Sequence, residues 1–250
     1  MSIVRPSDLE FIKRSGLIAA SALKKALQSV KAGVSELEID QIAQKEIYNL
    51  GGDLSYKTVP GYRWATCITV NDEVVHGIPT QNRLKEGDLV SVDLAVMYKG
   101  WHTDTAWTIL IGEDGEKLAF LKTGKEALKK GIKEAVVGKR VGDISYAVGS
   151  TVEGVGYSVV RSLVGHGVGR QLHEYPEIPG YGRKGTGEVL REGMSLAIEV
   201  IYTKGKSEVI LDEDGWTYRS ADGSLAGLFE STVIVGKKEA RVLTDWRKVG

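Results

Sequence analysis

Apolar positions follow a helical period in two stretches near the start of the chain. Over residues 7–23 they recur every three or four positions behind a candidate capping box. A second capping box, at residues 35–38, opens a stretch of the same period that stops at the Gly51-Gly52 pair. The pattern predicts two consecutive helices, the first of which ends near Gly33.

Strand-like runs rich in β-branched residues come next, and helical patterns then return. The elements predicted after residue 52 are strands at 65–70, 89–97 and 103–111, helices at 115–136 and 143–153, and a strand at 158–164. Helices and hairpin-forming strands in this order predict an α+β fold.

Landmark residues recur at one spacing along the chain. The pairs Gly33 and Gly138, Ile39 and Ile144, and Gly51 and Gly156 are each 105 residues apart. The shared offset predicts a single domain of two pseudo-symmetric halves, about residues 1–112 and 113–250. A chance match between common residue types is the alternative.

Asp93 and Asp104 stand inside two of the apolar strand patterns, where an unpaired carboxylate is costly. If these strands form a hairpin, opposed residues have a constant sum of residue numbers. The sum for the two acids is 197, which centres the turn between Tyr98 and Lys99. Like charges directly opposite each other destabilise a strand pair, so we expect a cation between them.

Glu199 and Glu230 repeat this arrangement in the second half. Asp214-Gly215 is a strong hairpin signal, and a turn centred there gives opposed residues a sum of 429, which Glu199 and Glu230 match. Asp93 and Glu199 are 106 residues apart, close to the repeat. We therefore expect each half to contribute one pair of acids to a shared site.

Four carboxylates that converge in a core carry a charge that two divalent cations neutralise. Carboxylates can bridge two metal ions about 3.5–4 Å apart. Salt bridges to Arg or Lys are the alternative explanation, but the strands supply no basic residues beside the acids. The pattern favours a metal site.

Composition limits the classes of function. The 250 residues include 33 Lys or Arg and 33 Asp or Glu, so neither a nucleic acid nor an anionic membrane is expected as the main partner. A lone cysteine, Cys67, is typical of a reducing compartment. The sequence has neither a signal peptide nor an apolar run near the ~20 residues of a membrane span. We expect a cytoplasmic protein.

Three of the four histidines are candidate functional residues. His166 lies between two glycines, where the backbone can pack tightly while the imidazole reaches inward. His173 follows seven residues later, and His76 stands at a turn after a strand. His102 is assigned a structural role.

With these residues in place, the chain resembles the type I methionine aminopeptidases, which belong to the pita-bread metallopeptidases. The matching motifs are residues 71–79, 91–93 with Asp104, 165–169 with His173-Glu174, 197–199, and Phe229-Glu230. The resemblance runs over nearly the whole chain. It implies a curved antiparallel sheet covered by helices and a hydrolase that removes the initiator methionine from nascent proteins.

The resemblance also implies a role for each motif residue. Two divalent metal ions are expected on Asp93, Asp104, His166, Glu199 and Glu230. Asp104 and Glu230 would bridge the ions, and Glu199 would also take part in proton transfer from a water that bridges the ions. His173 would steady the scissile carbonyl oxygen, and His76 would hydrogen-bond the scissile amide region. In the same way, Tyr62, Cys67 and Trp216, with Val59 and Leu172, align with the methionine pocket, where sulfur and aromatic walls suit a thioether.

This sequence departs from the family pattern at a few positions. Val200 stands where the family usually has Pro, and Ser231 stands where it usually has His. Val59 and Leu172 replace residues that are often aromatic. No ligand is lost, so we expect metal binding to survive, while side-chain preference, metal affinity and rate can differ.

Two other functions are the alternatives. One is a related pita-bread exopeptidase, such as an Xaa-Pro aminopeptidase or dipeptidase, although those usually carry an additional N-terminal domain. The other is a non-catalytic binding protein, which would be expected to have lost ligands. For the metal, Mn, Fe and Co suit an oxygen-rich site with one histidine, and Zn is also compatible. We expect a monomer without a ribosome-docking module of its own, which leaves a transient association with the ribosome.

Overall fold

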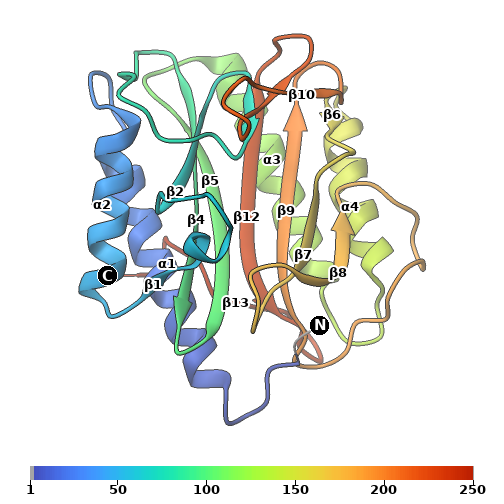
Figure 1. The fold of residues 1–250 in the computed structure, drawn as a ribbon. Helices are drawn as coiled ribbons and strands as arrows, with labels where there is room; N and C mark the ends of the chain where they lie inside the picture. The colour runs from blue at the N-terminus through green and yellow to red at the C-terminus, as the bar shows by residue number, and fades with distance from the viewer. Residues whose placement is uncertain (1–2, 250) are drawn as a thin grey trace.

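The computed structural model describes residues 3–249, in which helices cover one face of a large antiparallel sheet (Figure 1). The helices are α1 (Leu9–Ser29), α2 (Glu36–Asn49), α3 (Gly115–Glu134) and α4 (Val141–Glu153), with a short 3₁₀ turn, η1 (Ser55–Thr58). The strands are β1 (Asp53–Leu54), β2 (Thr66–Val70), β3 (Glu73–Val75), β4 (Leu89–Tyr98), β5 (Trp101–Leu110), β6 (Ser158–Val159), β7 (Val164–Gly167), β8 (Glu174–Pro179), β9 (Ser195–Thr203), β10 (Val209–Leu211), β11 (Tyr218–Ser220), β12 (Ala226–Ile234) and β13 (Arg241–Val242).

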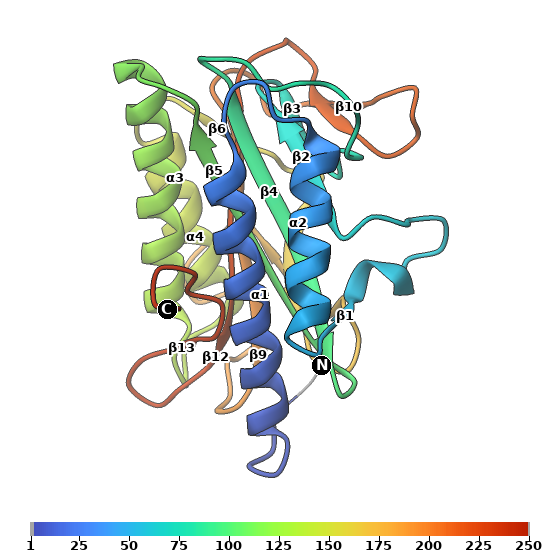
Figure 2. The same ribbon diagram turned by 90° about the vertical axis from the view of Figure 1, so that its left-hand side faces the viewer.

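The main sheet has ten strands, and its central path runs β1-β4-β5-β12-β9-β7-β8. Strand β2 pairs with β4, β6 with β9, and β13 with β12, while β10, β11 and β3 form a separate small sheet. Figure 2 shows α1 beside α2 and α3 beside α4, all on the same side of the main sheet. None of these four helices covers the opposite face of the sheet, where the site described below lies.

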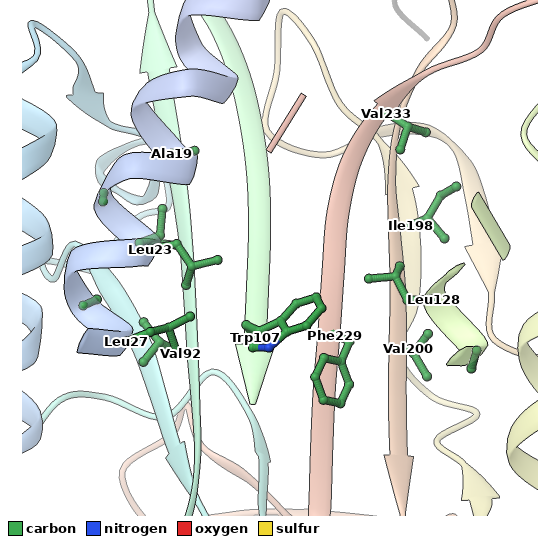
Figure 3. Packing of buried hydrophobic residues seen from close by; sticks show 14 of the residues in the cluster. Ala19, Leu23, Leu27, Val92, Trp107, Leu128, Ile198, Val200, Phe229 and Val233 are labelled. Carbon is green, nitrogen blue, oxygen red and sulfur yellow. The ribbon is translucent and has the colours of Figure 1, made fainter. Parts of the chain in front are cut away.

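The core lies between the helices and this covered face. Leu23 of α1 packs toward Val92 of β4, and Leu128 of α3 packs toward Val200 of β9 (Figure 3). Burying side chains of this kind contributes about 1.5–3 kcal/mol each. Helix α3 approaches closely because Gly124 has no Cβ, and one built there would lie 2.5 Å from the ring of Phe229.

Of the two predicted capping boxes, only the second forms. The Ser35 hydroxyl accepts from the Glu38 backbone N–H at 3.3 Å, and the Glu38 carboxylate accepts from the Ser35 N–H at 2.8 Å. Helix α1 instead begins after Asp8, whose side chain makes no capping hydrogen bond. It also ends at Ser29, earlier than predicted, because the following loop bonds to another segment through Gly33 N–H and Leu84 O at 2.8 Å.

The predicted strand at 158–164 is wrong as one continuous element. Strands β6 and β7 both pair with β9, at Thr203–Tyr202 and at Ala197–Leu196 respectively. Between them the chain leaves the edge of β9. Ser162 and Leu163 from this break line the cavity described below.

The spacing of 105 recurs in local geometry. Gly33 and Gly138 have φ of +87° and +86°, a left-handed conformation that glycine adopts without strain. Strands β1 and β6 begin 105 residues apart and pair with β4 and β9, the strands that carry Asp93 and Glu199. These recurrences favour two related halves, and the division near residue 112 stays a prediction.

Candidate metal centre and substrate cavity

Asp93 and Asp104 lie on one face of the sheet, but they are not directly opposed. Asp93 pairs with Ala106, and Asp104 pairs with Ala95. The turn is centred between Lys99 and Gly100, whose φ values of 51° and 75° fit a two-residue hairpin turn with left-handed central residues. The predicted register is therefore wrong by two residues. Because a shift of two keeps every side chain on its face, the acids still become diagonal neighbours.

The second pair of acids follows the predicted register. Glu199 of β9 is directly opposite Glu230 of β12. Glu230 is also opposite Ala106 of β5, the residue that faces Asp93 on the other side. Four adjacent strands thus place four carboxylates on the face away from the helices, because Val92, Trp107, Phe229 and Val200 alternate with the acids and point into the core.

These carboxylates line a cavity of about 310 Å³. Asp104, His166 and Glu230 each offer a ligand atom, and these atoms all lie within 4.8 Å of one another. Asp93 and Glu199 lie outside that group of three and line the same cavity. The structure therefore brings all five predicted ligands to one cavity.

His166 reaches the cavity from β7 because its neighbours are glycines. A Cβ on Gly165 would lie 2.8 Å from the carbonyl oxygen of Ala197, and one on Gly167 would collide with that of Tyr175. The His166 Nδ1–H donates a hydrogen bond of 2.9 Å to the Gly167 carbonyl oxygen. This tautomer leaves Nε2 as the free lone pair of the ring.

Without metal ions, the buried carboxylates repel one another and hold their protons more tightly than exposed acids do. Burial raises the pKa of Asp93 to about 7, and burial with the charge of Asp93 raises the pKa of Glu199 to about 8. Burial and the neighbouring carboxylates raise the pKa values of Asp104 and Glu230 well above their usual range. Burial lowers the pKa of His166 to about 4, so its ring is neutral and free to act as a ligand.

A divalent cation fits this donor set. Within residues 3–249, Glu230 Oε1 is buried without a hydrogen-bond partner. An unpartnered buried carboxylate oxygen is costly unless a cation or donor meets it. Hard divalent ions prefer carboxylate oxygens, and the neutral imidazole suits transition metals. The residues therefore match a metal site and not a set of internal salt bridges.

Three groups that hold Asp93 and Asp104 in place were not predicted from the sequence. The Tyr56 hydroxyl donates to Asp93 Oδ1 at 2.7 Å, and Thr105 N–H donates to Asp104 Oδ1 at 3.0 Å. The Thr232 hydroxyl donates to the Asp104 carbonyl oxygen at 2.8 Å. Tyr56 lies in η1, outside any strand pattern, and had no signal in the sequence. The two threonines lie on β5 and β12, and pairing of those strands would have pointed to them.

The predicted methionine pocket forms the apolar wall of the cavity. Tyr62, Cys67, Trp216 and Val59 line it, while Leu172 is buried in the same apolar cluster but does not line the cavity. The rings of Tyr62 and Trp216 meet edge to face at 5.1 Å. The Tyr62 hydroxyl donates to Cys67 Sγ at 3.2 Å, and Cys67 is directly opposite Asp93. Burial raises the pKa of the Cys67 thiol well above its usual range, so it stays protonated.

His76 and His173 lie at the mouth of the cavity. His76 follows β3 with φ of 59°, and its ring centroid is 5.9 Å from that of Tyr218. The ring centroid of His173 is 4.5 Å from that of His166. His102 does not line this cavity, and its Nδ1 lies 2.6 Å from the Ser55 hydroxyl.

Val200 and Ser231, which depart from the family pattern directly after Glu199 and Glu230, point away from the carboxylates. Val200 is fully buried in the core on the helix-covered face (Figure 3). Ser231 follows Glu230 on the strand and alternates to that same face. Their exchange therefore leaves the ligand oxygens where the strands place them.

Comparison with known proteins agrees with this geometry. Residues 10–237 match metallopeptidase family M24. The chain is 40% identical over 242 residues to methionine aminopeptidase 1 of Bacillus subtilis, covering 96% of this chain and 97% of that one. It is 38% identical to methionine aminopeptidase of Clostridium acetobutylicum, over 97% and 98% of the two chains.

Solved structures give the same result and confirm the expected α+β, pita-bread fold. Methionine aminopeptidase of Thermotoga maritima has a TM-score of 0.96 and 41% identity, with 98% of this chain and 99% of that one covered. Prolidase of Pyrococcus furiosus has a TM-score of 0.79 at 23% identity and is covered over 65% of its length, so it shares the fold alone. Within the described residues, no helix is long and apolar enough to cross a membrane. The chain belongs to metallopeptidase family M24, and within that family to the methionine aminopeptidases.

Proposed function

We propose that this protein removes the N-terminal methionine of new polypeptides, using two divalent metal ions held at the carboxylate cluster. The ligands are Asp93, Asp104, His166, Glu199 and Glu230. The observation that carries the proposal is one cavity that holds four carboxylates, among them the unpartnered buried Oε1 of Glu230, beside an apolar, sulfur-containing wall. Two divalent ions balance four carboxylates in charge, which supports a count of two.

Metal ions bound here supply Lewis acidity, which lowers the pKa of water and stabilises negative charge on a carbonyl oxygen. Asp104 and Glu230 would hold both ions, and of the four carboxylates they are the least exposed, at 4% and 3%. Mn, Fe or Co suits these ligands best, and Zn is also compatible.

The remaining side chains handle the proton and the substrate. Glu199 would take the proton from the attacking water and pass it to the leaving amine, because its carboxylate lines the same cavity as the other ligands. His173 donates a hydrogen bond to the scissile carbonyl oxygen as it gains charge. His76 hydrogen-bonds the scissile amide region. The substrate's free amine faces the metal site, which limits cleavage to the first residue.

The wall of Tyr62, Cys67 and Trp216 receives the methionine side chain. A thioether is flexible and polarizable and gains about 0.3–1.5 kcal/mol from each contact with an aromatic ring edge. The edge-to-face pair of Tyr62 and Trp216 offers such contacts. The cavity of about 310 Å³ has room for one such residue beside the metal site.

The finer expectations about the setting stay predictions. A cytoplasmic location is proposed because new polypeptides arise there. A monomeric state and a transient association with the ribosome rest on the sequence reasoning alone.

Release of the N-terminal residue from Met-Ala-Ser and from Ala-Pro-Ala, with metal-free and with Mn- or Co-loaded protein, tests the function. We expect metal-dependent cleavage of the methionine peptide alone. Cleavage of the proline peptide alone would assign the protein to the Pro-specific branch instead, and inactivity on both with metal bound would contradict an aminopeptidase role.

A further inference from the structure

A second cavity, of about 790 Å³, opens beside the metal centre. The two cavities share Val164, His166 and His173 in their walls. The rest of the second cavity is lined by β8, by the start of α4 and by the segment 181–188. We call it the β8 groove.

The floor of the β8 groove continues the face that carries the metal ligands. His166 of β7 is directly opposite Glu177 of β8, and Val164 is opposite Pro179. Directly opposed residues on antiparallel strands share a face of the sheet. Glu177 therefore stands on the same face as His166, one strand further from the metal site.

The far wall of the groove is fixed to the body of the protein. The Gly142 N–H donates to the Thr186 carbonyl oxygen at 2.9 Å, and Gly185 N–H donates to Asp143 Oδ1 at 3.0 Å. A Cβ on Gly142 would collide with the carbonyl oxygen of Arg183, so segment and helix are in close contact. The groove is thus part of the folded structure.

The carboxylates that line the β8 groove make its surface acidic. Glu174, Glu177 and Glu188 line it, together with the histidines of the site, and its lining includes no Lys or Arg among the described residues. Glu188 accepts hydrogen bonds from Arg191 at 3.3 Å and from the Tyr175 hydroxyl at 3.2 Å, and Glu174 accepts one from Gln171 N–H at 2.9 Å. Glu177 is exposed, and within residues 3–249 its side chain has no hydrogen-bond or ion-pair partner.

The position of the groove suits the part of a peptide that follows the cleaved bond. The methionine wall includes Cys67 of β2, and in the sheet β2 and β7 lie on opposite sides of the carboxylates. If methionine points toward β2, the rest of the peptide leaves toward β7 and β8. From β9 to β8 is two strand spacings, about 10 Å, which is the length of about three extended residues.

We propose, resting on the proposed function, that the peptide chain beyond the cleaved bond crosses β7 and β8 in this groove, where Glu177 favours a basic residue at the third or fourth position of the substrate. The occupant is a nascent polypeptide or peptide with Lys or Arg near its N-terminus. An exposed ion pair of this kind changes kcat/KM by about two- to five-fold.

The test uses two amidated hexapeptides, Met-Ala-Lys-Lys-Ala-Gly and Met-Ala-Glu-Glu-Ala-Gly, with metal-loaded protein. We expect kcat/KM to be higher for the lysine peptide at low salt, and the ratio to fall toward one in about 1 M NaCl because salt screens the pair. Glu177→Gln is expected to level the ratio, and Glu177→Lys to reverse it. Glu239→Gln, an exposed glutamate outside the groove, serves as the matched control and should keep the wild-type ratio.

A ratio that Glu177→Gln and Glu177→Lys leave unchanged would overturn the groove assignment, even if both peptides are good substrates. Failure to cleave either hexapeptide and the amidated tripeptide Met-Ala-Ser would instead refute the proposed function. The two failures are therefore distinguishable.

Discussion

The two hairpins that carry the carboxylates, β4–β5 and β9–β12, reach the same result with different amounts of chain. A two-residue turn, Lys99-Gly100, joins β4 to β5. Between β9 and β12 the chain makes a long excursion over residues 204–225, which includes β10, Trp216 and β11. The strand that flanks each hairpin differs as well. Strand β2 brings a thiol opposite Asp93, whereas β7 brings the imidazole of His166 beside β9.

The comparison separates two tasks. Placement of the acids needs only two strands in register, so both hairpins accomplish it. The flanking strands differ in what they add: β7 brings the imidazole of His166 to the acids, whereas β2 brings the Cys67 thiol to the apolar wall. Trp216, from residues 204–225, meets Tyr62 of the first half, so the proposed methionine pocket draws on both halves.

The largest effect is expected when one bridging acid is removed from either half. Asp104→Asn and Glu230→Gln should each lower kcat/KM by about 10³-fold or more, since each removes a charge that stabilises the metal site. Steady-state kinetics and titration with Mn or Co would measure both losses. Near-normal metal binding in one variant alone would show that the halves do not share the bridging role equally.

The next largest effect is expected when one of the two histidines at the cavity mouth is replaced. His173→Ala should lower kcat by about 10²-fold while metal binding is kept, because it removes a donor to the developing oxyanion. His76→Ala, in the first half, should cost less, since it holds the amide and not the growing charge. Single-turnover rates with metal titrations separate the two. A loss of folding in His173→Ala would favour a structural role instead.

Metal binding should stabilise the protein more at high pH than at low pH. In the metal-free fold, burial raises the pKa of Asp93 to about 7 and of Glu199 to about 8, above their values in the unfolded chain. The folded state then binds more protons, so the stability that these two groups contribute is fully present below about pH 4 and is lost as pH rises toward 8. Bound metal replaces those protons and adds about 2.7 kcal/mol at a concentration of 100 Kd. Thermal unfolding between pH 5 and 8, with metal and with chelator, should show a widening gap in Tm, and a constant gap would contradict the prediction.

Opening the pocket from either half should relax the preference for methionine. Trp216→Ala should change the ratio of kcat/KM for methionine and leucine peptides by about tenfold, since it removes a whole ring from the wall. Cys67→Ala removes a single atom and should change it less. Peptide series with different first residues would measure both ratios. An unchanged profile in Trp216→Ala would remove that residue from the pocket.

The smallest effect is expected for Arg219, whose ion pairs join residues 204–225 to the first half of the chain. Arg219 of β11 contacts Asp212 at 2.6 Å, Glu73 at 2.7 Å and Asp72 at 3.1 Å, and so ties the Trp216 hairpin to β3, next to His76. Arg219→Lys loses the forked geometry and should raise KM about two- to five-fold with little change in kcat. Arg83→Lys is the control, a guanidinium in an exposed pair with Glu38. Equal effects of the two substitutions would argue against a positioning role.

Sequence patterns predicted the acids because an unpaired carboxylate in an apolar strand is costly, and its presence there indicates a functional role. The register of Glu199 and Glu230 was predictable because Asp214-Gly215 forms a real turn, and even the short strands β10 and β11 keep the sum of 429. The first hairpin was placed two residues off because that prediction has Asp93 directly opposite Asp104, whereas the turn centres on Lys99 and Gly100, both with positive φ. Tyr56 was missed because its role depends on a loop that tertiary contacts place over Asp93.

The wall residue Cys67 has a consequence for chemical probes of this enzyme. It is the one cysteine in the sequence, it is 5% exposed, and its thiol is held protonated beside Asp93. General alkylating reagents in solution therefore meet an unreactive sulfur. An electrophile carried by a methionine-like group would meet the same protonated thiol, so labelling of Cys67 is expected to be slow even for reagents that enter the cavity.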